Sequence, residues 1–223
     1  MNDMKPLPLD PPYDWPGYGS TRLRFPREPL VALAAGAFDR PGPLVPNGFV
    51  HQGDNDLTRR GKTAPLGERM VLAGRLLDAD GRPVRRSLIE IWQTNASGRY
   101  HHPADNHDAP LDPNFHGIGR TLTDDDGWYR FVTVKPGAYP WQNHPYAWRP
   151  AHVHFVVSAP GYEPVTTHLF DSVDQYLKSD TVFAVKESLI CSFAVHNTAV
   201  HGVEPPVCTC NFDFVLKATD GHR

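Results

Sequence analysis

The sequence predicts an all-β protein: a β-sandwich of two mostly antiparallel sheets with long loops and one or two short helices. Two observations carry this prediction. The 23 prolines and 18 glycines are spread along the 223 residues between short apolar runs, as expected for many strands joined by turns. From Gly67 onward, segments of alternating apolar and polar residues recur, and that alternation is typical of half-buried strands.

Two long segments contain tight-turn signals. The stretch "RMVLAGRLLDADGRPVRRSLIEIWQ" alternates on both sides of DADG, and "RTLTDDDGWYRFVTVKPG" does so around DDDG. Asp-Gly pairs supply the positive φ values that tight turns need, so both stretches are predicted to be hairpins. Further strands are predicted for "AHVHFVVSAPG", "PVTTHLFD" and "NFDFVLKA" (211–218).

Helix is expected in two places. Residues 26–38, "PREPLVALAAGAF", space their apolar side chains as a helix does, and the second half of 176–190 resembles that spacing. Residues 1–25 are proline-rich and aperiodic, which favours an extended N-terminal arm. We therefore expect one domain over 1–223, with the β-sandwich core at 67–218.

The composition and net charge indicate which class of binding partner to expect. An apolar content of 40% and a formal net charge of −3 give no attraction to nucleic acid or to anionic lipid, so a small molecule is the expected partner. The first residues lack the basic and apolar regions of a signal peptide, and we expect a cytoplasmic location.

The three cysteines, Cys191, Cys208 and Cys210, form an odd set without a disulfide framework, which fits a reducing compartment. The pair Cys208 and Cys210 could hold a soft metal. Small, half-buried side chains explain it better, because no second cysteine pair accompanies it.

Residues 137–155, "GAYPWQNHPYAWRPAHVHF", crowd aromatic and basic side chains together and end on a His-x-His motif. Side chains on a strand alternate between faces, so His152 and His154 share one face, roughly 6–7 Å apart along the backbone. Val153 and Phe155 then face the core. Two imidazoles on one face can converge on a metal ion, or they can be polar residues on a solvent-facing strand.

Two tyrosines near this motif, Tyr100 and Tyr139, favour the metal. A phenol with a pKa of about 10 gives up its proton only beside a strong cation, such as a trivalent ion that prefers oxygen ligands. Two phenolates, two neutral imidazoles and one hydroxide balance the charge of Fe(III), so such a set can be buried. Histidines alone, or with a carboxylate, would suit Zn(II) or Fe(II) instead.

Four blocks, "EIWQTNASGRYHH", "APLDPNFHGIGRTLTDDDGWYRF", "VKPGAYPWQN" and "WRPAHVHF", resemble in order and spacing the signature blocks of the intradiol ring-cleavage dioxygenases. Within that family they are most similar to the iron-bearing β chains of protocatechuate 3,4-dioxygenases, and the likeness runs from about residue 16 to 216. The resemblance implies a β-sandwich with one non-haem Fe(III) per chain, held by Tyr100, Tyr139, His152 and His154.

The resemblance also implies a reaction. A catechol-type ring is opened between its two hydroxylated carbons, and both atoms of O₂ end in a cis,cis-muconate-type diacid; protocatechuate giving 3-carboxymuconate is the expected case. Tyr139 is implied as the labile ligand that accepts a substrate proton, and Arg149 as the cation that stabilises anionic charge. Contact with the substrate is implied for Tyr18, Trp92, Trp141, Gln142 and Val182.

Two positions depart from the protocatechuate pattern. His168, in "TTHLF", stands where those enzymes usually have glutamine beside the arginine, which makes it a further catalytic candidate. Gln142 stands where they tend to have an arginine near the ring carboxylate. His168 and the segment 176–190 resemble hydroxyquinol 1,2-dioxygenases, so hydroxyquinol or another substituted catechol is the alternative substrate.

Other readings concern function and assembly. A metal-free, transthyretin-like β-sandwich binding module is the alternative of another class, although it has no need of two tyrosines beside the His-x-His motif. The family resemblance implies an oligomer, formed either with a homologous α chain or by copies of this chain alone. The remaining loop histidines need no metal to explain them: His101, His102, His107, His116 and His144.

Overall fold

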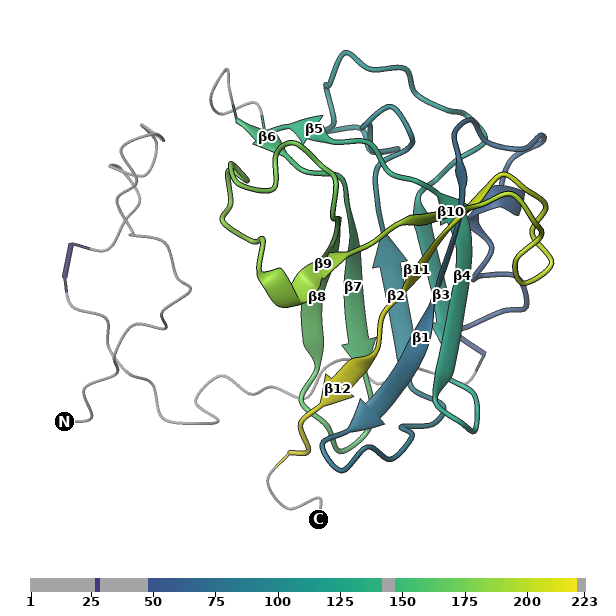
Figure 1. Ribbon diagram of the computed structural model, residues 1–223, viewed down its shortest axis with the longest axis vertical. Coiled ribbons are helices and arrows are strands. Elements are labelled where there is room, and N and C mark those ends of the chain that lie inside the picture. Colours follow the sequence, from purple (N-terminus) through teal and green to yellow (C-terminus); the bar gives the residue numbers. More distant parts are fainter. Residues whose placement is uncertain (1–26, 29–47, 142–146, 220–223) are drawn as a thin grey trace.

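The computed structural model describes residues 27–28, 48–141 and 147–219, and these form two β-sheets packed face to face (Figure 1). The first sheet contains β1 (Arg69–Asp78), β4 (Trp128–Val134), β10 (Ala194–His196), β11 (Val207–Asn211) and β12 (Phe214–Leu216). The second contains β2 (Leu88–Trp92), β3 (Ile118–Leu122), β7 (His152–Ser158), β8 (Val165–Asp171) and β9 (Ile190–Cys191). The predicted β-sandwich is confirmed.

Smaller elements complete the described chain. β5 (Tyr139–Pro140) and β6 (Trp148–Arg149) pair with each other, near the upper end of β7 in Figure 1. The two short helices are 3₁₀ turns, η1 (Leu57–Arg59) and η2 (Glu187–Leu189).

Strand β1 lies at the centre of the first sheet. It pairs with β4 antiparallel, and with β11 and β12 in parallel, so the sheet is mixed. Met70, Leu72 and Leu76 face the main core, whereas Val71 and Ala73 face a smaller apolar cluster on the other side. Burial on both faces explains why this strand reads as a nearly continuous apolar run.

One apolar core fills the space between the sheets, and β7 supplies part of it. Val153, Phe155 and Val157 have no exposed surface, whereas His152 and His154 lie on the opposite face of the strand. The predicted alternation of β7 is therefore confirmed, and it places the histidines outside the core.

Both predicted hairpins are wrong, although the turns themselves are present. Gly81 and Gly127 each have φ of 78°, and their N–H groups donate to the carbonyls of Asp78 (3.0 Å) and Asp124 (3.1 Å). However, β1 and β2 lie in different sheets, as do β3 and β4. Each turn leads the chain from one sheet to the other, because β1 is already flanked by β4, β11 and β12.

The helix predictions for 26–38 and 176–190 have different outcomes. The arm at 1–25 lies outside the described residues, and so does nearly all of 26–38. In 176–190, helix is limited to the single 3₁₀ turn η2, which lies in the predicted second half and is followed directly by β9. No helix in the described part of the chain is long and apolar enough to cross a membrane. The cytoplasmic location stays a prediction.

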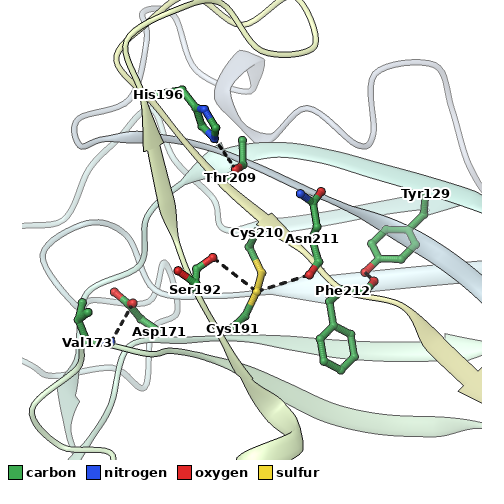
Figure 2. The surroundings of a disulfide bond; sticks show 10 residues. All are labelled: Tyr129, Asp171, Val173, Cys191, Ser192, His196, Thr209, Cys210, Asn211 and Phe212. Carbon is green, nitrogen blue, oxygen red and sulfur yellow. Dashed lines mark hydrogen bonds between the residues drawn. A yellow bond between two sulfur atoms is a disulfide. The ribbon is translucent and has the colours of Figure 1, made fainter.

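The expectation about cysteines is also wrong. Cys191 on β9 and Cys210 on β11 form a disulfide, with Cα atoms 6.3 Å apart (Figure 2). Cys208 is buried and unpaired. The two bonded strands belong to opposite sheets, so the bond joins the halves of the sandwich. Nothing in the sequence spacing shows that these strands face each other. With Cys210 in a disulfide, the soft-metal alternative for this pair fails.

Candidate metal centre

The candidate centre begins with a row of side chains across the second sheet. In the strand register, His154 of β7 is paired with Trp92 of β2 on one side and with His168 of β8 on the other. The Trp92 ring stacks on the imidazole of His154, with ring centroids 4.4 Å apart and planes 6° apart. This row fixes the orientation of His154 before any ligand is considered.

His168 lies closer to the two motif histidines than the sequence alone could show. Its ring centroid is 4.5 Å from that of His154 and 5.2 Å from that of His152. Ring nitrogens of all three residues lie within 4.8 Å of one another. The structure therefore brings a third imidazole into the predicted site.

Tyr100 reaches this cluster from the loop after β2. The side-chain oxygen of Asn95 accepts hydrogen bonds from the backbone N–H of Ser97 (3.0 Å) and Arg99 (2.9 Å), which shapes the turn. The Tyr100 N–H donates to a carboxylate oxygen of Asp105 at 2.7 Å. As a result the Tyr100 Oη lies 3.0 Å from Nε2 of His154.

Tyr139 arrives on β5, where it is paired in register with Arg149 of β6. Its ring meets the Tyr100 ring edge to face, with centroids 5.3 Å apart, and lies 5.6 Å from the His152 ring. The loops that carry the two tyrosines pack backbone to backbone. A Cβ atom on Gly98, which has φ of 82°, would overlap the carbonyl of Ala138.

The spacing of the donor atoms fits one metal ion. The Nε2 atoms of His152 and His154 are 3.1 Å apart, and Tyr100 Oη is 3.0 Å from the latter. Two ligand atoms bonded to one ion at about 2.0–2.2 Å lie about 3–3.5 Å apart. One phenol and two imidazoles therefore lie at the separation that a shared ion requires, and the Tyr139 ring lies beside them.

The protonation states also suit metal binding. Nδ1 of His152 donates to the Pro150 carbonyl at 2.6 Å, which leaves the Nε2 lone pair free. Burial, reinforced by the positive charge of Arg149, holds the pKa of His152 well below its usual value. Burial and the neighbouring His168 lower the pKa of His154 to about 3, and burial with Arg149 lowers that of His168 to about 4. All three imidazoles are neutral at pH 7.

Tyr100 needs a cation before it can ionise. Burial, followed by the neighbouring Tyr139, raises the pKa of the Tyr100 phenol above its usual value. An ionised Tyr100 in this position therefore requires a strong positive charge within reach of its oxygen. This donor chemistry fits a trivalent, oxygen-seeking ion.

Arg149 is held by a partner that sequence reasoning missed. It is 3% exposed, and its Nε and NH2 atoms donate to the carboxylate of Asp180 at 3.0 and 3.4 Å. Its NH1 atom lies 3.4 Å from Tyr139 Oη. Asp180 lies in the first half of 176–190, where the sequence has no periodic pattern and resembles an ordinary loop. The signal that could have found it is the rule that a buried guanidinium requires a carboxylate.

A cavity of about 550 Å³ opens beside the two tyrosines. Its described lining contains Trp92, Gln93, Tyr100, His101, His102, Ala104, Asp105, Asn106, His116, Gly117, Ile118, Tyr139, Pro140 and Trp141. Of the predicted substrate contacts, Trp92 and Trp141 lie on this wall. Val182 does not; it is 38% exposed, two residues after Asp180. Tyr18 and Gln142 lie outside the described residues.

Two family models match this chain. A family model described as "Dioxygenase" matches residues 42–218, and one described as "Protocatechuate 3,4-dioxygenase beta subunit N terminal" matches residues 11–35. Together these two matches account for most of the chain, including every strand described above.

Individual relatives are also dioxygenases by name. The protocatechuate 3,4-dioxygenase beta chain of Burkholderia cepacia is 42% identical over 221 residues, which covers 96% of this chain and 92% of that one. Hydroxyquinol 1,2-dioxygenase of a Rhizobium species (strain MTP-10005) is 41% identical over 140 residues, covering 57% of this chain and 45% of that enzyme.

Among solved structures, hydroxyquinol 1,2-dioxygenase from Pseudomonas putida DLL-E4 superposes with a TM-score of 0.62 at 31% identity. The match covers 80% of this chain and 65% of that one. Catechol 1,2-dioxygenase from Acinetobacter sp. ADP1 gives a TM-score of 0.64 at 29% identity, covering 75% of this chain and 58% of that one. This chain thus spans less than two-thirds of the length of these structural relatives.

Proposed function

This chain belongs to the intradiol ring-cleavage dioxygenase family, and from that premise we propose that it opens a catechol-type ring with a non-haem Fe(III) ion as cofactor. The observation that carries the proposal is the convergence of two phenols and two imidazoles beside one cavity. We assign the ligands of one ion per chain to Tyr100, Tyr139, His152 and His154. A metal-free binding module would gain nothing from this costly set of buried polar groups.

When bound, the ion would hold both oxygens of the diol and activate the ring toward O₂, so that both oxygen atoms would end in a muconate-type diacid. The protein's own residues prepare this step. As a phenolate, Tyr139 would accept a proton from the diol, and Arg149, whose NH1 atom lies 3.4 Å from the Tyr139 oxygen, would hold that oxygen in place. Arg149 places a fixed positive charge beside the reacting oxygens.

The surrounding side chains orient and enclose the ring. Trp92 and Trp141 provide apolar walls that exclude water from the cavity. His168, as a neutral imidazole against His154, is a further catalytic candidate that can hydrogen-bond the substrate. Substrate contact by Tyr18, Gln142 and Val182 stays a prediction.

The proposed substrate is protocatechuate, which gives 3-carboxymuconate. The support is similarity across nearly the whole chain to a protein named as a protocatechuate 3,4-dioxygenase beta chain. Hydroxyquinol is the second candidate, favoured by His168 inside the site and by the hydroxyquinol 1,2-dioxygenase relatives. The ranking of kcat/KM across protocatechuate, hydroxyquinol and catechol separates the two.

Assembly is part of the proposal. The name of the Burkholderia cepacia relative, a beta chain, supports pairing with a homologous α chain. A homo-oligomer is the other possibility. Light scattering on the chain expressed alone distinguishes the two assemblies, because an oligomer that forms without an α chain supports the homo-oligomer.

The test of the proposed function is a visible absorption spectrum of the iron-loaded protein, before and after addition of protocatechuate under argon. We expect a tyrosinate-to-iron charge-transfer band that shifts when the diol binds. His152→Ala is expected to lose the iron, whereas Tyr139→Phe retains iron with an altered band. Tyr162→Phe, in the turn at the other end of β7, is the matched control and leaves the band in place. A colourless protein after iron loading contradicts the ligand assignment.

A further inference from the structure

Two histidines without a role in the proposed chemistry form a contact pair on the cavity wall. The Nδ1 atoms of His101 and His116 are 3.3 Å apart, and their rings meet edge to face with centroids separated by 4.4 Å. They come from different segments of the chain, yet both line the cavity that Tyr100 and Tyr139 line. We call these two residues the histidine pair.

The contact fixes what the histidine pair can offer to a ligand. Two facing Nδ1 atoms share one proton, so one ring donates and the other accepts. The accepting ring is neutral only if its own proton sits on Nε2. The histidine pair therefore presents one Nε2–H donor and one Nε2 lone pair. Among the described residues, none forms a hydrogen bond with either Nε2 atom.

The rest of the cavity wall has few polar groups that are available to a ligand. None of its described lining residues is a lysine or an arginine. The carboxylate of Asp105 is already occupied, since its oxygens accept from the N–H groups of Tyr100 (2.7 Å) and His107 (2.9 Å). The amide of Gln93 is likewise satisfied by the Val134 carbonyl and by the Thr133 hydroxyl. Together with His102 and Asn106, the histidine pair remains as a polar group on a largely apolar wall.

The position of the histidine pair suits the far side of a bound ring. In the second sheet, Ile118 is paired with Trp92, and Trp92 with His154. Two strand spacings therefore separate Ile118 from His154, about 10 Å. His116 precedes Ile118 by two residues. A ring chelated through its diol beside His154 would direct its other substituents across the cavity toward this wall.

Resting on the proposed function, we propose that the histidine pair binds the oxygen-bearing substituent that a catechol-type ring carries in addition to its diol. A third hydroxyl matches both the Nε2–H donor and the Nε2 lone pair, whereas a carboxylate uses the donor. A hydrogen or a methyl group leaves both unmet. The histidine pair thus discriminates among catechols by substituent chemistry, at the opposite side of the ring from the iron ligands.

The test compares His116→Phe with His102→Phe in the iron-loaded protein. Phenylalanine keeps the ring but removes the hydrogen-bonding nitrogens. His102 is the matched control, because it lines the same cavity while its Nδ1 accepts the N–H of Ala104 at 3.1 Å. The measured quantities are kcat/KM and the anaerobic Kd, for hydroxyquinol, protocatechuate, 4-methylcatechol and catechol.

We expect His116→Phe to lower the preference for hydroxyquinol or protocatechuate over catechol about two- to tenfold, as loss of one hydrogen bond implies. The substrate whose ratio falls identifies the substituent, hydroxyl or carboxylate. The ratio of 4-methylcatechol to catechol stays constant, and so do all ratios in His102→Phe. Unchanged ratios in His116→Phe, or equal losses in both variants, overturn the proposal. If the wild-type protein cleaves no catechol, the proposed function fails, and the Kd ratios still decide the role of the histidine pair.

Discussion

Asp180 holds the Arg149 side chain in place. Arg149 is a buried cation between the phenol of Tyr139 and the carboxylate of Asp180, which is itself 4% exposed. Removing one member of a buried ion pair leaves an uncompensated charge, which costs about 3–5 kcal/mol. Asp180 also accepts the N–H of Ala184 at 3.0 Å, so it ties the loop after β8 to the site.

Asp180→Asn is predicted to lower kcat at least about tenfold, because a hydrogen bond to a charged group is lost and the guanidinium shifts away from Tyr139. Iron content and KM are expected to change less. Steady-state kinetics on protein of measured iron content check this outcome.

The matched control is Asp171→Asn. Asp171 is equally buried and pairs with Lys135 at 2.7 Å, but it does not contact Arg149. This variant is expected to unfold more easily while its folded fraction keeps its kcat. Equal losses of kcat in both variants would show that Asp180 acts on stability alone.

At single positions, the sequence predicted what local rules determine. Strand alternation was enough to place His152 and His154 on one face and Val153 and Phe155 in the core. Asp180 was missed because its partner is 31 residues away and its loop has no periodic pattern. The histidine pair was interpreted as two separate loop residues for the same reason.

Among the elements, the two loops that carry the tyrosines depend on glycine. Gly98 adopts φ of 82°, and its α-carbon packs so closely on the next loop that a side chain would overlap the Ala138 carbonyl. Gly137 is equally constrained, with the Gly98 nitrogen 2.5 Å from a Cβ position there. The approach of Tyr100 to Tyr139 therefore rests on two residues without side chains.

Gly98→Ala is predicted to lower both the free energy of unfolding and the affinity for iron, because the two loops must separate. Gly81→Ala is the control: it has φ of 78° but no atom within 4 Å of the added Cβ. The control is expected to cost about 1–2 kcal/mol from the left-handed backbone alone. Urea unfolding and iron analysis of both variants decide the matter. Equal behaviour would mean that the contact between the loops is unimportant.

Turn chemistry predicted the turns but not which strands pair. The Asp-Gly signals at Gly81 and Gly127 are real turns, yet each connects different sheets. A local signal cannot tell a hairpin from a crossing, since that depends on which distant strands already occupy the neighbouring positions. Strand β11 was not predicted at all, because "VCTCN" is short, although Pro205 and Pro206 directly before it are a turn signal.

Across the whole molecule, the disulfide between Cys191 and Cys210 joins the two sheets of the sandwich (Figure 2). It closes a loop of 19 residues, for which the lost entropy of the unfolded chain corresponds to about 3 kcal/mol. Reduction with dithiothreitol is predicted to lower the free energy of urea unfolding by about that amount. The double variant Cys191→Ala and Cys210→Ala is expected to be insensitive to the reductant. A wild-type protein equally insensitive would argue against the bond in solution.

The fold class was predictable because composition and alternation are properties of the whole chain. The central position of β1 was not, since its parallel partners β11 and β12 lie more than a hundred residues further along the sequence. Parallel strands are not joined by a tight turn, so no short sequence pattern predicts that they pair.

That pairing has a consequence during synthesis. β1 is among the first strands to leave the ribosome, but β11 and β12 are the last of the described strands to do so. Until they emerge, one side of β1 stays without hydrogen-bond partners, and the apolar faces of a nascent sandwich remain open to water and to other chains. We therefore expect β1 to remain incompletely paired until residues 207–216 have emerged from the ribosome.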